Sequence, residues 1–97
     1  MVIISIDMKV TPRNSDEFLQ TVKDLNALTR KEKGCVSCNI YKDLEDENLF
    51  SLVEAWETKE DRDNHLKSNN FSVLRGAMSL LEEPPDITFS RVYRKKP

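Results

Sequence analysis

Apolar and polar residues alternate at the start of the chain and then recur with helical spacing. Residues 2–10 are apolar at every second position, which predicts a half-buried strand built on Val2, Ile4, Ile6, Met8 and Val10. Asn14 with Glu17 three residues later is an N-cap signal. A helix is therefore expected over residues 15–32, with its apolar stripe at Phe18, Leu19, Val22, Leu25 and Leu28.

Two further strands and two further helical segments follow. Residues 35–42 and 49–57 are expected to be strands, and the short polar turn between them implies an antiparallel hairpin. Thr58 and Asp61 fit a capping box that opens a polar helix. A second stripe of apolar residues at helical spacing predicts another helix, which ends before Pro84. The stripe consists of Phe71, Leu74, Met78 and Leu81.

A last strand is expected at residues 86–94, which completes the order β-α-β-β-α-β in one domain over residues 1–97. This order predicts an α+β ferredoxin-like sandwich, in which both helices cover one face of a four-stranded antiparallel sheet. The other face would be open. The strand at 49–57 is apolar on both sides, with Leu49, Val53 and Ala55 on one side and Phe50, Leu52 and Trp56 on the other.

A second copy of the chain is the simplest cover for that open face. We therefore expect a homodimer whose open sheet faces pack together as a dimeric α+β barrel. The alternative is a mixed face that tolerates water. Composition favours the dimer, because only 38% of the 97 residues are apolar, against roughly 45–50% in ordinary globular chains.

Charge and hydropathy exclude several classes of partner. The formal net charge is −2 and the basic residues are scattered among acidic ones, so the basic surface that nucleic acid requires is not expected. No apolar run approaches the 18 or so residues needed to span a bilayer, and no leader pattern is present. We expect a soluble, cytoplasmic protein without a membrane partner.

The two cysteines, Cys35 and Cys38, form a C-x-x-C pattern within a predicted strand. Residues three apart on a regular strand point to opposite faces, so we expect passive thiols rather than a redox pair. With a single histidine and no second C-x-x-C, a four-ligand zinc site within one subunit is also excluded.

The sequence contains few motifs that indicate catalysis. No serine or cysteine pattern accompanies the one histidine, and the only glycines, Gly34 and Gly76, cannot form a phosphate-binding loop, so no nucleotide cofactor is implied. One cluster of candidate residues remains at the end of the third strand and on the following helices: Glu54, Trp56, His65, Phe71 and Arg75.

Each member of this cluster has a functional and a structural interpretation. Trp56 could flank a flat aromatic ligand or anchor the core. His65 could transfer a proton near neutral pH or be a satisfied core histidine. Glu54 is an acid on an apolar strand face, so either it is paired, with Arg91 or Arg75, or burial raises its pKa.

Three motifs, in this order and spacing, carry a resemblance to a known family. They are Gly34 ahead of the second strand, the ending Glu54-Ala55-Trp56-Glu57 of the third strand, and the pair His65-Leu66 nine residues after the tryptophan. Over nearly its whole length the chain resembles the antibiotic biosynthesis monooxygenase family of small dimeric α+β barrels.

The resemblance implies a ferredoxin-like fold, dimerisation through the sheets and a pocket between sheet and helices. For characterised members it also implies cofactor-independent oxygenation of quinols or anthrone-like aromatics. An electron-rich hydroquinone can lose a proton and then reduce oxygen itself, so the pocket need only bind it, desolvate it and stabilise its anion. Trp56 would flank the ring, and His65 or Arg75 would stabilise or shuttle charge.

The chain also departs from two branches of the family. The pocket asparagine and tyrosine of polyketide-modifying members would fall at Leu52 and Arg62, which argues against their substrates. The haem-degrading members' histidine and asparagine would fall at about Arg75 and near Ile6, which argues against haem degradation.

The resulting prediction is a cofactor-independent, metal-free monooxygenase that binds a small aromatic compound, such as a quinol, in one pocket per subunit. Alternatives are a non-catalytic binding or sensor protein on the same barrel and an isomerase or decarboxylase, since one fold hosts several chemistries. An open pocket beside Trp56, with His65 or Arg75 pointing into it, would favour catalysis, and a filled layer would favour a structural module. The predicted catalytic residues are Trp56, His65 and Arg75, and the predicted substrate contacts are Leu52, Glu54, Phe71 and Met78.

Overall fold

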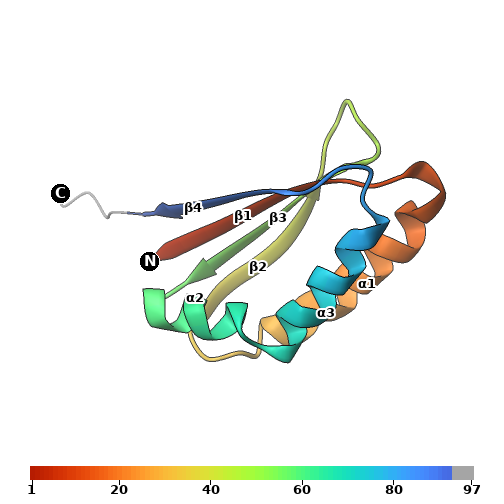
Figure 1. The fold of residues 1–97 in the computed structure, drawn as a ribbon. Coiled ribbons are helices and arrows are strands. Elements are labelled where there is room, and N and C mark those ends of the chain that lie inside the picture. The colour runs from red at the N-terminus through yellow and green to blue at the C-terminus, as the bar shows by residue number, and fades with distance from the viewer. Residues whose placement is uncertain (93–97) are drawn as a thin grey trace.

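A four-stranded antiparallel sheet forms one layer of the molecule in the computed structural model, which describes residues 1–92 (Figure 1). The strands lie in the order β2-β3-β1-β4, as in a ferredoxin-like fold, which confirms the predicted class. The predicted strand at 86–94 ends at Arg91, and positions 93 and 94 lie outside the described residues. The strands are β1 Val2–Lys9, β2 Cys35–Lys42, β3 Leu49–Trp56 and β4 Asp86–Arg91.

Helices cover only one face of this sheet (Figure 1). They are α1 Ser15–Thr29, α2 Lys59–Leu66 and α3 Asn69–Ala77, with single 3₁₀ turns at η1 Pro12–Asn14 and η2 Met78–Leu80. The capping prediction for α2 is confirmed, because Thr58 Oγ1 accepts the Asp61 backbone N–H at 3.1 Å. The side chain of Asn14 does not cap α1; it donates to Thr11 Oγ1 instead. No helix within residues 1–92 is long and apolar enough to cross a membrane.

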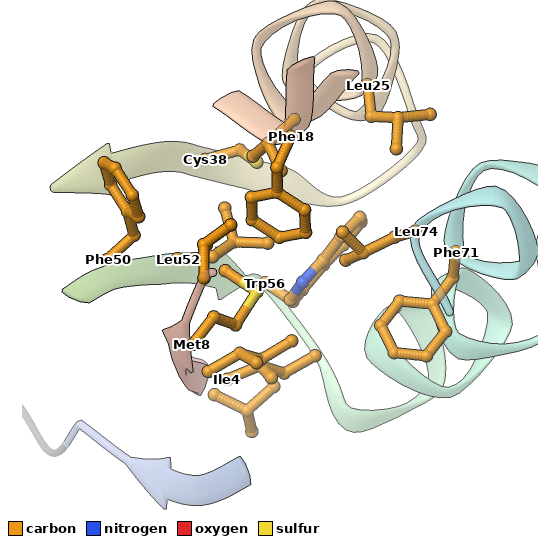
Figure 2. Packing of buried hydrophobic residues seen from close by; sticks show 14 residues of the cluster. Ile4, Met8, Phe18, Leu25, Cys38, Phe50, Leu52, Trp56, Phe71 and Leu74 are labelled. Carbon is orange, nitrogen blue, oxygen red and sulfur yellow. The ribbon is translucent and has the colours of Figure 1, made fainter. Parts of the chain in front are cut away.

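The core lies between the helices and the sheet. The alternating side chains of β1 all face this layer, and Ile4, Ile6 and Met8 are fully buried. Phe18 and Val22 of α1 belong to the same buried cluster, and Figure 2 shows the Phe18 ring on the α1 side of Met8 and Ile4. Burying a side chain of this size stabilises the fold by roughly 1.5–3 kcal/mol, so this one layer supplies most of the hydrophobic stabilisation.

A β-bulge at the start of β2 corrects the prediction for the two cysteines. Cys35 pairs with Trp56 and Cys38 pairs with Glu54, so one extra residue is inserted between them. Both thiols therefore lie on the helix-covered side, because Trp56 and Glu54 face that side. Burial, and then the Glu54 carboxylate, raise the pKa of Cys38 to about 12, and its Sγ donates to Asn26 Oδ1. Such a thiol is a packing group, as predicted.

The helices stop short of the edge strand β4 (Figure 1). Ile87 pairs with Ile6, and Phe89 pairs with Ile4, so both β4 side chains lie on the helix-facing side. They are nevertheless 44% and 52% exposed. The helix-facing side of the sheet is thus covered over β1 and β3 and open at β4.

Gly34 fixes how α2 meets the sheet. Its backbone has φ +83°, in the left-handed region that glycine adopts most readily, and its carbonyl accepts the Glu57 N–H at 2.9 Å. A methyl group at this position would overlap the side chain of Asp61, which is buried at the start of α2. The glycine that the sequence motif singles out therefore lets α2 pack closely against the chain just before β2.

A left-handed backbone alone costs an alanine about 1–2 kcal/mol. Gly34→Ala is expected to lower the free energy of unfolding by more than this, because the Asp61 side chain must also move. Gly76→Ala on α3 is the matched control. An added Cβ there meets nothing within 4 Å, so it should stabilise by about 0.5–1 kcal/mol. Urea denaturation of both variants measures this, and equal stability of the two would contradict the packing described for Gly34.

Candidate functional site

The centre of the site is a buried histidine held between two carboxylates. His65, on α2, is only 2% exposed. Its Nδ1 lies 3.0 Å from Glu32 Oε2, and its Nε2 lies 3.0 Å from Glu54 Oε1. Nδ1 is well aligned with its acceptor, whereas the Nε2–H direction misses Glu54, so the second contact is a close ionic one rather than a hydrogen bond.

Trp56 fixes both the imidazole and one of the carboxylates. Its ring stacks on His65 with centroids 4.6 Å apart and planes 25° from parallel. Its Nε1–H donates to Glu54 Oε1 at 3.1 Å. Trp56 and Glu54 are two residues apart on β3 and therefore share the helix-covered face. The strand period thus places the tryptophan N–H and the carboxylate side by side.

The second carboxylate comes from the turn between α1 and β2. Glu32 is partly exposed and also accepts a hydrogen bond from Asn70 Nδ2 at 3.1 Å. Phe71, the next residue of α3, meets the imidazole edge-on at 5.5 Å. The cluster therefore joins the α1–β2 turn, β3, α2 and α3.

The charges of the two carboxylates decide the protonation of His65. Burial alone would lower its pKa, but the contact with Glu54 and, after it, the contact with Glu32 outweigh burial and raise the pKa above the ordinary value. Both carboxylates thus favour the protonated ring, and with His65 protonated the group of one imidazolium and two carboxylates would carry one net negative charge. Within residues 1–92 no group of histidine, cysteine and acidic side chains is arranged to hold a metal ion.

The structure brings five of the seven predicted site residues together. Leu52, Glu54, Trp56, His65 and Phe71 are all buried in the layer between sheet and helices. Met78 is half-buried at the edge of this layer. Arg75 is exposed and lies over the Phe71 ring at 5.2 Å. The proposed partners of Glu54 were wrong, because His65 and Trp56 occupy its carboxylate instead of Arg91 or Arg75.

Two cavities lined by described residues lie outside this cluster. The larger, of about 350 Å³, is lined by Arg62, Phe89, Ser90 and Arg91, and the smaller, of about 190 Å³, by Leu19, Lys23, Ile40, Tyr41, Lys42 and Phe50. None of the seven predicted site residues lines either cavity. The pocket expected beside Trp56 therefore stays a prediction.

The larger cavity nevertheless lies on the same sheet face as the histidine cluster. Across the sheet, Phe89 pairs with Ile4, which pairs with Glu54. Two strand spacings, about 10 Å in total, separate the first and last of these positions. Arg62 lies one helical turn before His65 on α2, so one helix contributes to both places.

The residues that sequence reasoning missed are Glu32, Asn70 and the lining of the larger cavity. Glu32 fell at the end of the predicted first helix, where no periodic pattern marks it. The only available signal was the single buried histidine, which needs a partner for each ring nitrogen.

Comparison with known sequences gives one family match and two curated relatives. Residues 1–76 match the model of the family described as antibiotic biosynthesis monooxygenase. The Bacillus subtilis protein YcnE, which carries a provisional monooxygenase name, is 27% identical over 90% of this chain and 93% of its own length. The uncharacterized protein sll1783 of Synechocystis is 25% identical over 94% of this chain. This chain spans 63% of that relative's length.

Solved structures show the same fold. A conserved protein from Methanosarcina mazei is 28% identical, with a TM-score of 0.86 over 98% of this chain and 92% of its own. A Deinococcus radiodurans structure, with a provisional antibiotic biosynthesis monooxygenase name, has a TM-score of 0.91 over 100% of this chain and 97% of its own. Its 20% identity supports the fold alone.

The raised pKa of His65 predicts a pH-dependent stability. Its contribution is fully present below the unfolded pKa of about 6.5 and is lost as the pH rises from there through the raised pKa of the folded state. The free energy of unfolding, measured by urea denaturation, should therefore fall over this interval. His65→Gln should be less stable and should lack this slope, because the chain has no other histidine. The same slope in both proteins would contradict the assignment.

Proposed function

The chain belongs to the antibiotic biosynthesis monooxygenase family, and we propose that it oxidises a small electron-rich aromatic compound, such as a quinol, with molecular oxygen and without a bound cofactor. Family membership and the provisional monooxygenase name of YcnE support the reaction class. The site residues of this chain suggest how the reaction proceeds.

One observation carries the proposal: two carboxylates flank the single buried imidazole, so that with His65 protonated the Glu32–His65–Glu54 cluster holds one net negative charge. Such a cluster can take up one proton and become neutral overall. Loss of a proton is the step that makes a hydroquinone or anthrone electron-rich enough to reduce oxygen. Glu54 is the acceptor in this proposal because it is the carboxylate on the sheet face, and Trp56 is a positioning residue that holds Glu54 and His65.

The atoms and electrons of the reaction balance without a further reductant. An anthrone-type CH₂ group loses a proton, and its anion gives an electron to O₂. The two radicals combine to a peroxide, which loses water, so CH₂ and O₂ become C=O and H₂O. A hydroquinone reacts in the same way at a free ring C–H: its anion gives an electron to O₂, the two radicals combine at that carbon, and the peroxide loses water, so hydroquinone and O₂ become hydroxyquinone and H₂O.

The proposal requires that substrate binding open the α2 side of the cluster, because Trp56, His65 and Glu54 are at most 2% exposed. The same burial, which keeps a ligand away from Glu54 unless the layer opens, also favours a second candidate function: a small-molecule binding protein that keeps the barrel and performs no chemistry. The two candidates differ in whether the protein takes up oxygen when the aromatic compound is added.

Oxygen uptake with reduced menadione and with anthrone distinguishes these functions. The monooxygenase proposal predicts uptake above the protein-free blank, with anthraquinone from anthrone and a hydroxylated quinone from reduced menadione as products. Glu54→Gln should lower kcat by about 100-fold or more, the usual effect of removing a general base. Glu57→Gln is the matched control, because Glu57 is exposed just beyond the end of β3, and it should leave kcat unchanged. If neither substrate consumes oxygen above the blank, the binding function replaces this one.

A homodimer through the uncovered sheet face is part of the same proposal. This face presents Ile3, Leu49, Val53 and Ala55 among polar residues such as Ser5 and Ser51. Contiguous apolar side chains on the central strands are costly to leave in water, and a second sheet would cover them. Membership of the family also favours a dimer.

Light scattering at micromolar concentration should give the mass of two chains. Val53→Glu, at the centre of the face, should shift the mass toward one chain, because a dimer would bury two carboxylates against each other. Val73→Glu on the exposed side of α3 is the matched control and should leave the dimer intact. A monomeric wild-type protein would remove the proposed interface.

A further inference from the structure

The cavity between α2 and β4 combines an exposed aromatic ring with two guanidinium groups. We propose that it binds a small aromatic anion, with the ring of the ligand against Phe89 and its carboxylate or phenolate group between Arg62 and Arg91. This inference rests on the proposed function only in taking such an anion to be the substrate; binding itself does not depend on catalysis.

Phe89 supplies the apolar surface. Its ring is 52% exposed because the helices end before β4, and the Arg62 guanidinium lies 5.0 Å from its centroid. A guanidinium over a ring makes a flat, weakly hydrated surface of positive charge and π electrons. An aromatic ligand can stack on this surface and withdraw it from water.

The Arg62 guanidinium is held in place by a neighbouring carboxylate, and one of its nitrogens is left without a hydrogen-bond partner among the described residues. Its Nε and Nη2 both donate to Asp63 Oδ1, at 3.2 and 3.0 Å, and its side chain is only 16% exposed. Its Nη1 has no hydrogen-bond partner among residues 1–92. The ion pair therefore holds the guanidinium rigid and leaves one edge for a ligand oxygen.

Arg91 provides the charge that makes the cavity positive. It lines the cavity from β4 and forms no ion pair with any residue in the described part of the chain. Asp63 balances Arg62, so the cavity keeps about one positive charge in a protein whose net charge is −2. A neutral ligand would not use this charge, whereas a carboxylate would pair with it directly.

The size of the cavity limits the ligand to a small molecule. Its volume of about 350 Å³ lies at the low end of the roughly 300–1,000 Å³ typical of ligand sites, which suits one or two fused rings. The cavity beside Lys23 and Lys42, at about 190 Å³, falls below that range. Size therefore favours the arginine-lined cavity as the ligand site.

Isothermal titration calorimetry with 1-hydroxy-2-naphthoate and 2-methyl-1-naphthol tests the proposal, since the two probes differ in a carboxylate against a methyl group. The anion should bind at least about tenfold more tightly, and its advantage should shrink as salt is raised. Arg91→Gln should weaken anion binding by about fivefold or more and leave the neutral probe within twofold. Arg62→Gln should weaken anion binding by about fivefold or more and the neutral probe by less, because Arg62 is also part of the stacking surface. Arg13→Gln, an exposed arginine on η1, is the charge-matched control and should change neither.

Equal affinity for the two probes, or anion binding that survives both cavity substitutions, would overturn the proposal. Inorganic phosphate as a third probe should bind at least tenfold more weakly than the naphthoate, and equal binding would remove the aromatic part of the proposal. Arg91 is exposed, so its variant tests the site even where Arg62→Gln perturbs α2. Anion binding without oxygen uptake would refute the monooxygenase proposal alone.

Discussion

The position of His65 between the Glu54 and Glu32 carboxylates is the constraint on which the rest of the structure depends. An isolated buried charge costs several kcal/mol, so the buried Glu54 carboxylate is tolerable only beside a partner such as His65, which the partly exposed Glu32 also contacts. The three side chains come from β3, from α2 and from the turn after α1, and each element must therefore reach one point. The close packing of Gly34 against Asp61 and the stacking of Trp56 on His65 serve that same convergence.

Much of the fold follows from local patterns in the sequence. The period-two pattern of β1 and the Thr58 cap of α2 predict those elements correctly, because each depends on neighbouring residues. The bulge at Val36 could not be predicted, since an extra residue in one strand leaves no mark in the alternation of so short a segment. It reverses the side on which Cys35 lies relative to Cys38.

The sequence predicts which residues form the candidate site, but it does not predict which of them contact one another. Strand period and the capped helix place Trp56, Glu54 and His65 near one another, but the pairing of Glu54 with histidine rather than arginine depends on helix placement that no local pattern specifies. The cavity at Arg62 and Arg91 arises because the helices leave β4 uncovered, which is a property of the packed layers. Together these features give one sheet face a buried proton-holding cluster and, two strands away, a positive aromatic-lined cavity.

The protonation state of His65 can be read directly from the ¹⁵N NMR shifts of its two ring nitrogens at about pH 7, slightly above the ordinary histidine pKa of about 6.5. Only one histidine contributes, so the assignment is unambiguous. A ring held between two carboxylates should show two protonated nitrogens, the pattern of an imidazolium. One protonated and one bare nitrogen, the pattern of a neutral tautomer, would contradict the charged cluster at the centre of this site.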